Sequence, residues 1–202
     1  MKKLNKLLKI SAIFILLFLS NQLIAQTNTS PTQNVCAGSL NEPYLIPANT
    51  QNVTSIFNWT ISSGGVIASG QGTNQIAIDW SAIPGGPHVI TVVETDVYGC
   101  LGVPVTVDVT IIPLDDASFT LTDYCEGSSN SATVTGTTGG TFTFTTLPTS
   151  GETIDASTGE ITGGLSGTTY SVTYTTLGIC SQTSIISVTI YITPTTGPIS
   201  HW

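Results

Sequence analysis

Hydrophobic and polar residues alternate along most of the chain, which is the pattern of half-buried β-strands. The clearest case is the stretch 103–111, where valine or isoleucine occupies every second position. The same spacing recurs at 57–61, 76–80, 142–144, 170–174 and 186–192. Since no stretch shows helical spacing with capping residues, the sequence predicts an all-β fold.

Glycine and proline clusters separate these strands from one another. The clusters at 63–65, 84–87 and 139–140 mark turns at the intervals expected of packed sheets of short strands. A cysteine-containing frame recurs at 36–39 and 125–128. We therefore predict two tandem antiparallel β-sandwiches, at 36–113 and 114–192, joined by a short linker. A segment at 26–35 precedes the first sandwich, and a tail at 193–202 follows the second.

The first 25 residues have the composition of a signal peptide. All four Lys residues lie within the first nine positions, and an apolar run follows from Ile10 to Leu19. Small residues come next, with a cleavage site expected after Ala25. We therefore expect an exported protein without residues 1–25.

The remaining chain carries all twelve acidic residues and neither Lys nor Arg. Proteins hold nucleic acids and anionic membranes through basic side chains, so these partners are excluded. No later apolar run approaches the roughly 20 residues that span a bilayer. We expect no transmembrane segment after the signal peptide.

Four cysteines in an exported chain are typical of disulfides. Three connectivities are possible, but the frame C-A-G-S at 36–39 recurs as C-E-G-S at 125–128, and each frame precedes one further cysteine. This repeat favours one bridge within each sandwich, Cys36–Cys100 and Cys125–Cys180. Each bridge would stabilise its sandwich by about 4 kcal/mol.

Several motifs resemble a known group of surface proteins. The first sandwich contains C-A-G-S, F-N-W-T, G-Q-G-T-N-Q-I-A-I-D-W and Y-G-C, and the second contains T-G-G-T-F-T-F and I-D-A-S-T-G-E-I-T-G-G. They resemble the PKD-like and Ig-like repeats of adhesins from gliding, type IX-secreting bacteria. The resemblance implies two Ig-like (PKD-like) sandwiches that act as non-catalytic spacers or adhesive units. Cargo of that route normally ends in a sorting domain, and nothing after Ile192 is long enough to be one.

Catalytic chemistry has little basis in this sequence. Of the two histidines, His88 follows a proline at the start of a strand, and His201 is the penultimate residue. Neither position suggests a general base beside a nucleophile. We predict that the protein is not an enzyme and needs no cofactor, except that calcium is a candidate ligand.

Calcium would bind at Asp115 and Asp116, which lie at the expected junction of the sandwiches. Hard cations take carboxylate oxygens, and junctions between such domains bring carboxylates together. The alternative is that these side chains are solvated and keep a Thr-rich surface soluble.

Polysaccharide binding would require exposed aromatic side chains. Trp80 at a strand end and Tyr98 are the candidates, with Tyr44 and Tyr124 as further possibilities. The alternative for Trp80 is packing in the core, to which we assign Trp59 as the central tryptophan of its sandwich.

The tail provides a third candidate site. Its prolines end the last sheet and favour an extended chain, and it carries Ile199, His201 and Trp202. These side chains are suited to docking in the pockets of a partner. The alternatives are a frayed end and a chain cut from a longer adhesin.

These observations predict a structural or adhesive protein that is periplasmic or associated with the outer membrane or cell surface. It would act through protein contacts, docked by its tail to an outer-membrane or surface protein. The second hypothesis is a carbohydrate-binding module, assisted by calcium. Because no Lys protects the strand edges, strand addition and self-assembly are also open.

Overall fold

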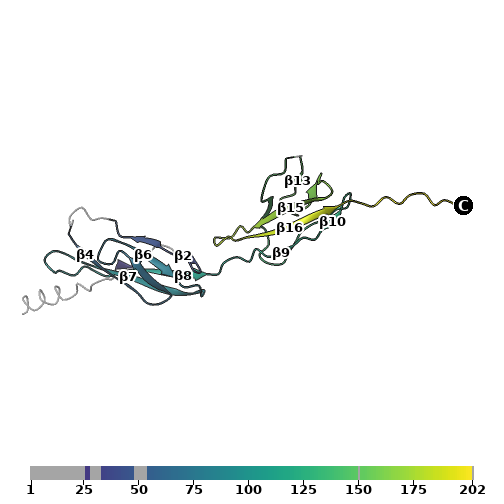
Figure 1. Cartoon of the computed structure of the whole chain (residues 1–202). Helices are drawn as coiled ribbons and strands as arrows, with labels where there is room; N and C mark the ends of the chain where they lie inside the picture. Colours follow the sequence, from purple (N-terminus) through teal and green to yellow (C-terminus); the bar gives the residue numbers. More distant parts are fainter. Residues whose placement is uncertain (1–25, 28–32, 48–53, 150, 202) are drawn as a thin grey trace, which may run out of the picture. The chain divides into compact units, whose positions relative to one another are not determined.

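The computed structural model describes residues 26–27, 33–47, 54–149 and 151–201 (Figure 1). All regular elements in these ranges are β-strands, so the prediction of an all-β fold is confirmed. The described residues accordingly include no helix that would cross a bilayer. The predicted signal peptide, 1–25, lies outside the described residues.

The chain divides into two compact units, Met1–Ile112 and Pro113–Trp202. Each unit is described separately below.

Two sheets form unit 1. The larger sheet has the order β1-β8-β7-β4, with β2 also paired to β8, and the smaller has the order β3-β6-β5. Both β1 and β2 run parallel to β8, whereas all the other pairs are antiparallel. The strands are β1 (Gln26–Thr27), β2 (Gln33–Cys36), β3 (Glu42–Leu45), β4 (Ile56–Ile61), β5 (Gly65–Ser69), β6 (Gln75–Trp80), β7 (Gly85–Thr95) and β8 (Val105–Ile112).

The core of unit 1 lies between its two sheets and is mainly aliphatic. In β6, Ile76, Ile78 and Trp80 are buried at alternate positions, as the hydrophobic pattern predicts. Trp59 from β4 is also buried, and its indole N–H donates to the backbone oxygen of Thr73 at 2.8 Å. The assignment of Trp59 to the core is therefore confirmed.

Unit 2 repeats this arrangement with shorter strands. Its main sheet has the order β10-β16-β15-β12, and two small sheets pair β11 with β9 and β13 with β14. The strands are β9 (Phe119–Thr120), β10 (Tyr124–Cys125), β11 (Thr133–Val134), β12 (Thr141–Phe144), β13 (Thr153–Ile154), β14 (Ile161–Thr162), β15 (Thr168–Thr175) and β16 (Thr183–Tyr191).

Aromatic rings contact one another in the core of unit 2. The ring centroids of Phe142 and Tyr174 lie 4.6 Å apart, and those of Phe119 and Phe142 lie 5.3 Å apart. Tyr174 is buried, and its hydroxyl donates to the backbone oxygen of Thr137 at 2.8 Å. Burial of these rings contributes to the stability of this unit.

The repeated cysteine frame forms the same turn in both units. Cys36 ends β2 and Cys125 ends β10, and each strand pairs in parallel with the last strand of its sheet. The serine three residues later donates its N–H to the cysteine carbonyl, at 3.0 Å in both turns. The glycine between them has a φ of 77° at Gly38 and 81° at Gly127, which favours glycine. The frame is thus a turn signature.

The predicted disulfide pairing is wrong. Cys36 and Cys180 are the two disulfide-bonded cysteines, whereas Cys100 and Cys125 are exposed free thiols. Neither Cys36–Cys100 nor Cys125–Cys180 is therefore formed.

The strand order within each unit explains this correction. Cys36 pairs with Ile112 at the end of β8, whereas Cys100 precedes the start of β8. Likewise, Cys125 pairs with Tyr191 at the end of β16, and Cys180 precedes its start. More than about 20 Å of strand separates each predicted pair. A disulfide requires Cα atoms about 4.4–6.8 Å apart.

Candidate binding surfaces

Trp80 belongs to the core of unit 1, which corrects its prediction as a glycan-binding side chain. Only 3% of its surface is exposed. Its ring packs edge-on against Tyr44, with 6.2 Å between the centroids. A sugar cannot stack on a buried ring, so Trp80 stabilises the sandwich instead. Burial also raises the pKa of Tyr44 to about 12.

Tyr98, by contrast, is 87% exposed in the turn between β7 and β8. Asp96 shapes this turn, since its Oδ1 accepts the N–H groups of Tyr98 at 2.9 Å and Cys100 at 2.8 Å. Val97 and Leu101 are exposed on either side. The turn therefore presents an aromatic ring in an apolar surround.

The carboxylates of Asp115 and Asp116 stabilise local structure. Asp115 Oδ2 accepts the N–H of Gly178 at 3.0 Å, and Asp116 Oδ1 accepts the N–H of Ser118 at 2.9 Å. Hydrogen bonds from the Ser118 hydroxyl and backbone lower the pKa of Asp116. Within the described ranges, no three His, Cys, Asp or Glu side chains come together to hold a metal ion. Calcium binding at these two residues stays a prediction.

His88 does contact a hydroxyl, but the pair lacks the rest of a catalytic site. Its Nδ1 lies 3.0 Å from Ser63 Oγ, and the ring stands against Trp80. Its Nε2 is buried and has no hydrogen-bond partner in the described part of the chain. A serine nucleophile requires a base that a third group orients, and this imidazole has none there.

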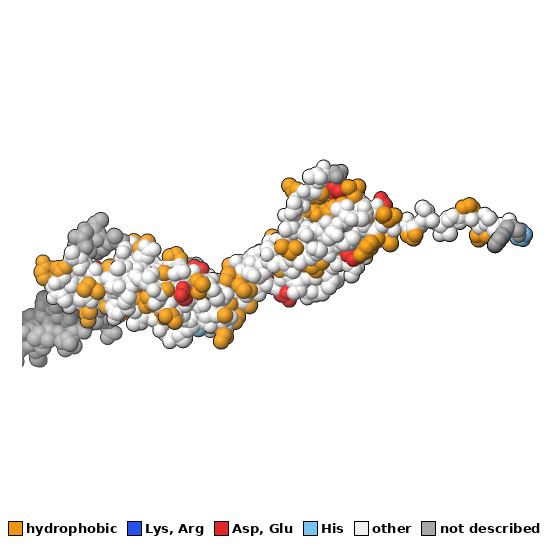
Figure 2. Space-filling model, viewed as in Figure 1, with side chains coloured by type: hydrophobic (Ala, Val, Ile, Leu, Met, Phe, Trp, Pro, Cys, Tyr) orange, Lys and Arg blue, Asp and Glu red, His pale blue; other side chains and the backbone are white. Residues whose placement is uncertain are grey.

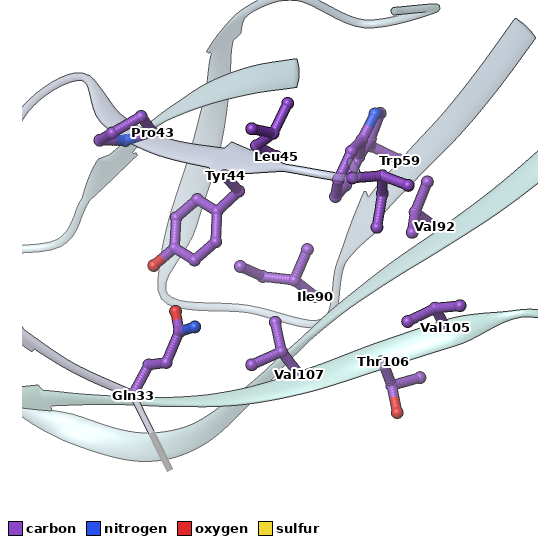
Figure 3. Close-up of a pocket in the computed structure, with 11 residues that line it drawn as sticks. Gln33, Pro43, Tyr44, Leu45, Trp59, Ile90, Val92, Val105, Thr106 and Val107 are labelled. Atoms are coloured by element: carbon purple, nitrogen blue, oxygen red, sulfur yellow. The ribbon is translucent and has the colours of Figure 1, made fainter. Parts of the chain in front are cut away.

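A pocket of about 140 Å³ opens between β3 and the β7–β8 pair (Figure 3). Figure 3 shows Tyr44 on one side and Val107 on the other, with Ile90 between them. Its other lining side chains are mainly apolar. Such an apolar lining is typical of incomplete packing between two sheets. It provides no acid–base pair for catalysis.

Unit 2 carries a more polar groove of about 430 Å³. It is lined by Tyr124 from β10 and by the carboxylates of Glu126 and Glu160. Burial raises the pKa of the half-buried Tyr124. Tyr124 was a candidate from the sequence, but neither glutamate was predicted. Glu160 is distant in the chain from Tyr124 and Glu126, so only folding brings the three together.

The segment Thr193–His201 is exposed throughout and forms no strand after β16 (Figure 1). Among the described residues, one hydrogen bond joins it to the rest of unit 2, from Thr193 Oγ1 to the backbone oxygen of Glu126 at 2.6 Å. The side chain of Ile199 is completely exposed, and that of His201 is exposed too. Trp202 lies outside the described residues. The segment thus presents an apolar side chain to solvent.

The outer edge of β4 is closed by a side chain that the sequence pattern did not reveal. Gln71 Oε1 accepts the N–H of Trp59 at 3.0 Å, and Gln71 Nε2 donates to the Trp59 carbonyl at 2.9 Å. Gly72 and Phe57 exchange two backbone hydrogen bonds beside it. The carboxamide of Gln71 thus mimics a peptide group of a neighbouring strand.

The surface between these features is polar and acidic. Figure 2 shows red acidic groups and scattered orange hydrophobic groups, without blue basic groups on the described residues. This agrees with a sequence in which all Lys residues lie within the first nine positions.

Residues 22–101 match the family model of the PKD-like domain. The match covers the greater part of unit 1 and supports the resemblance seen in its motifs. No curated protein matches the chain in sequence.

Solved structures with tandem domains are similar in part. The insect immune protein hemolin shares 11% identity over 84% of this chain and 46% of its own, with a TM-score of 0.36. The fibronectin(III)-like modules of Clostridium thermocellum CbhA share 13% over 87% and 97%, with a TM-score of 0.39. Chicken VE-cadherin EC1-2 shares 12% over 83% and 100%, with a TM-score of 0.32. This chain spans less than half of the hemolin structure, and similarities this low say nothing about ligand or partner.

Proposed function

We propose that this chain is an exported, non-catalytic Ig-like module of the cell envelope that acts through protein–protein contacts. The observation that carries the proposal is the exposed segment Thr193–His201, which holds Ile199 entirely in solvent. An extended chain with an apolar side chain is suited to capture by a partner's pockets or strand edges. We infer that it docks the protein to an outer-membrane or surface partner.

Three further features support this function. Residues 22–101 match the PKD-like domain, and disulfide-bonded cysteines are typical of exported proteins. The acidic surface without basic groups favours protein or polysaccharide partners over nucleic acids. The gliding, type IX-secreting context and a place at the cell surface or in the periplasm belong to the same proposal.

Co-purification from the native envelope in mild detergent tests the docking role. The bait would be the chain from residue 26, compared with variants Ile199→Ser and Thr196→Ser. We expect I199S to reduce recovery of the partner at least about fivefold, because it removes the apolar anchor. The control T196S keeps Ile199 and removes only one methyl group from the segment. Equal recovery by all three baits would refute docking through this segment.

A carbohydrate-binding module is the second candidate function. Two features favour it, the groove at Tyr124, Glu126 and Glu160 and the exposed ring of Tyr98. Sugars stack on aromatic rings, and their hydroxyls donate hydrogen bonds to carboxylates. Retention on a defined polysaccharide, lost in Tyr98→Ala or Tyr124→Ala, would support this function. Loss of retention with a chelator would in addition support assistance by calcium.

A further inference from the structure

One edge of β16 is uncovered over the first part of the strand. On one side β16 pairs with β15 from Thr183 to Ile190. On its other side β10 covers only Ile190 and Tyr191. A strand edge of this kind is a template for pairing with another chain segment.

The hydrogen-bond pattern shows which residues face that open edge. Thr176 N donates to Gln182 O at 3.0 Å, and Gly167 N donates to Ile190 O at 2.7 Å. Even-numbered residues around and within β16 therefore bond toward β15. Since neighbouring residues in a strand point their backbone groups to opposite sides, the odd-numbered residues face outward.

Only some of the outward-facing backbone groups of β16 have hydrogen-bond partners. The N–H of Thr189 donates to Asp123 Oδ1 at 2.8 Å. The outward backbone groups of Ile185 and Ser187 have no hydrogen-bond partner among the described residues. The Ile185 side chain is 57% exposed beside them. The open edge thus combines free donors and acceptors with an apolar contact.

Unit 1 contains a strand at the equivalent place. There β1 pairs in parallel with Val105 and Thr106 of β8. Cys36 pairs with Ile112 of β8, and Cys125 pairs with Tyr191 of β16, so Ile112 and Tyr191 are equivalent positions. Counted back from these two residues, Val105 and Thr106 correspond to Ser184 and Ile185 of unit 2. The same edge is therefore occupied in one unit and vacant in the other.

The prolines of the segment Thr193–His201 are placed so that one edge of its backbone keeps every N–H group. Both of its prolines, Pro194 and Pro198, occupy even-numbered positions. Proline lacks an N–H, so an added strand must turn its prolines away from the acceptor. Every odd-numbered residue retains its N–H, and these residues are Thr193, Thr195, Gly197, Ile199 and His201.

The segment is also electrostatically suited to this acidic protein, because it carries neither Asp nor Glu. It cannot readily turn back onto its own β16, since β10 occupies the edge at Ile190 and Tyr191, next to where the segment leaves the strand. The donor is therefore on a different copy.

We propose that the open edge of β16 accepts the segment Thr193–His201 of a second copy as an added strand, bonded through the odd-numbered residues of that segment. This deepens the proposed function by naming the partner as another molecule of the same chain. Each copy donates one segment and accepts another, so the contact builds dimers or open chains of molecules.

Sedimentation velocity of the chain from residue 26, with exposed thiols alkylated, tests this contact. We expect species larger than a monomer as concentration rises. Thr195→Pro removes an inward N–H and should weaken association at least about tenfold, while Thr196→Pro changes an outward position and should leave it within about twofold. Equal effects of T195P and T196P, or a monomer at all concentrations, would overturn the proposal.

A mixing experiment separates this result from misfolding. Ile185→Pro removes an outward N–H without touching the β15 ladder, and Ile185→Thr is its matched control. We expect I185P and T195P each to stay monomeric alone and to form a 1:1 dimer when mixed, since one retains the donor segment and the other the acceptor edge. Failure of the mixture to associate would refute strand addition between copies.

The envelope co-purification gives an independent outcome. A partner lost with I199S, together with an exclusively monomeric chain, would retain the proposed function and reject the second copy. The opposite result is self-association that T195P weakens and T196P does not, with no envelope partner recovered. That result would support the second copy and reject the outer-membrane partner.

Discussion

The two units share one strand plan but close their edges differently. In both, a short parallel strand ending in cysteine pairs with the last strand, and a long hairpin follows in the sheet order. Unit 1 covers β8 with β1 and seals β4 with the carboxamide of Gln71. Unit 2 leaves the first part of β16 open. Equal topology therefore does not imply equal capacity to bind another chain.

The cores differ as well. Unit 1 buries mainly Ile and Val around Trp59 and Trp80, whereas unit 2 gathers Phe119, Phe142 and Tyr174 in mutual ring contact. Each core buries four aromatic side chains, so the two units differ in how their rings contact one another and not in how many rings they bury.

Truncation of a buried core side chain should give the largest loss of stability, and each substitution should destabilise only its own unit. Phe142→Ala should destabilise unit 2 by about 3–5 kcal/mol, and Ile78→Ala should destabilise unit 1 by about 2–5 kcal/mol, because both side chains are buried. Hydrogen exchange measured strand by strand checks this. Loss of protection in both units from either single substitution would contradict independent cores.

Removing the edge seal should have a medium effect confined to unit 1. Gln71→Leu leaves the N–H and C=O of Trp59 without partners and should cost about 1–3 kcal/mol in urea unfolding. Gln75→Leu, at an exposed position nearby, should change stability by less than about 0.5 kcal/mol. Similar losses in Q71L and Q75L would mean that the carboxamide does not seal β4.

Alkaline pH should weaken unit 1 through Tyr44. Burial raises its pKa to about 12, above the value of about 10 expected when unfolded. The folded state then holds the proton more tightly, so this contribution is complete below about pH 10 and is lost as pH rises toward about 12. Tyr44→Phe should reduce this loss in unfolding curves on both sides of about pH 10. An unchanged pH dependence in Y44F would contradict it.

Changes at the exposed thiols should have the smallest effect on stability. Cys100→Ser and Cys125→Ser should each shift stability by less than about 0.5 kcal/mol. The native chain should titrate two thiols per molecule without reductant, and each substitution should remove one. A peptide map that joins Cys36 to Cys100 would instead restore the pairing predicted from the repeat.

Much of the fold was predictable from sequence because strand alternation is a local property. The buried positions of β6 and the core role of Trp59 follow directly from spacing. The glycine of each C-x-G-S frame likewise marks a turn that forms in both units. These features depend on a few neighbouring residues, and distant segments do not change them.

The candidate sites were less predictable because exposure depends on distant contacts. Trp80 and Tyr98 were both candidates for sugar binding in the sequence. In the structure Trp80 packs against Tyr44, whereas Tyr98 is exposed to solvent. The carboxylates of Asp115 and Asp116 are engaged by backbone donors that only folding brings near.

The sequence alone determined the all-β class, the two-part organisation and the absence of basic groups beyond the first nine residues, since alternation, turn residues and composition act locally or as totals. Tertiary structure decided at which end of each sheet a cysteine lies and which strand edges stay open. Those outcomes depend on strand order and register, which join residues far apart in the chain and leave no local periodic signal.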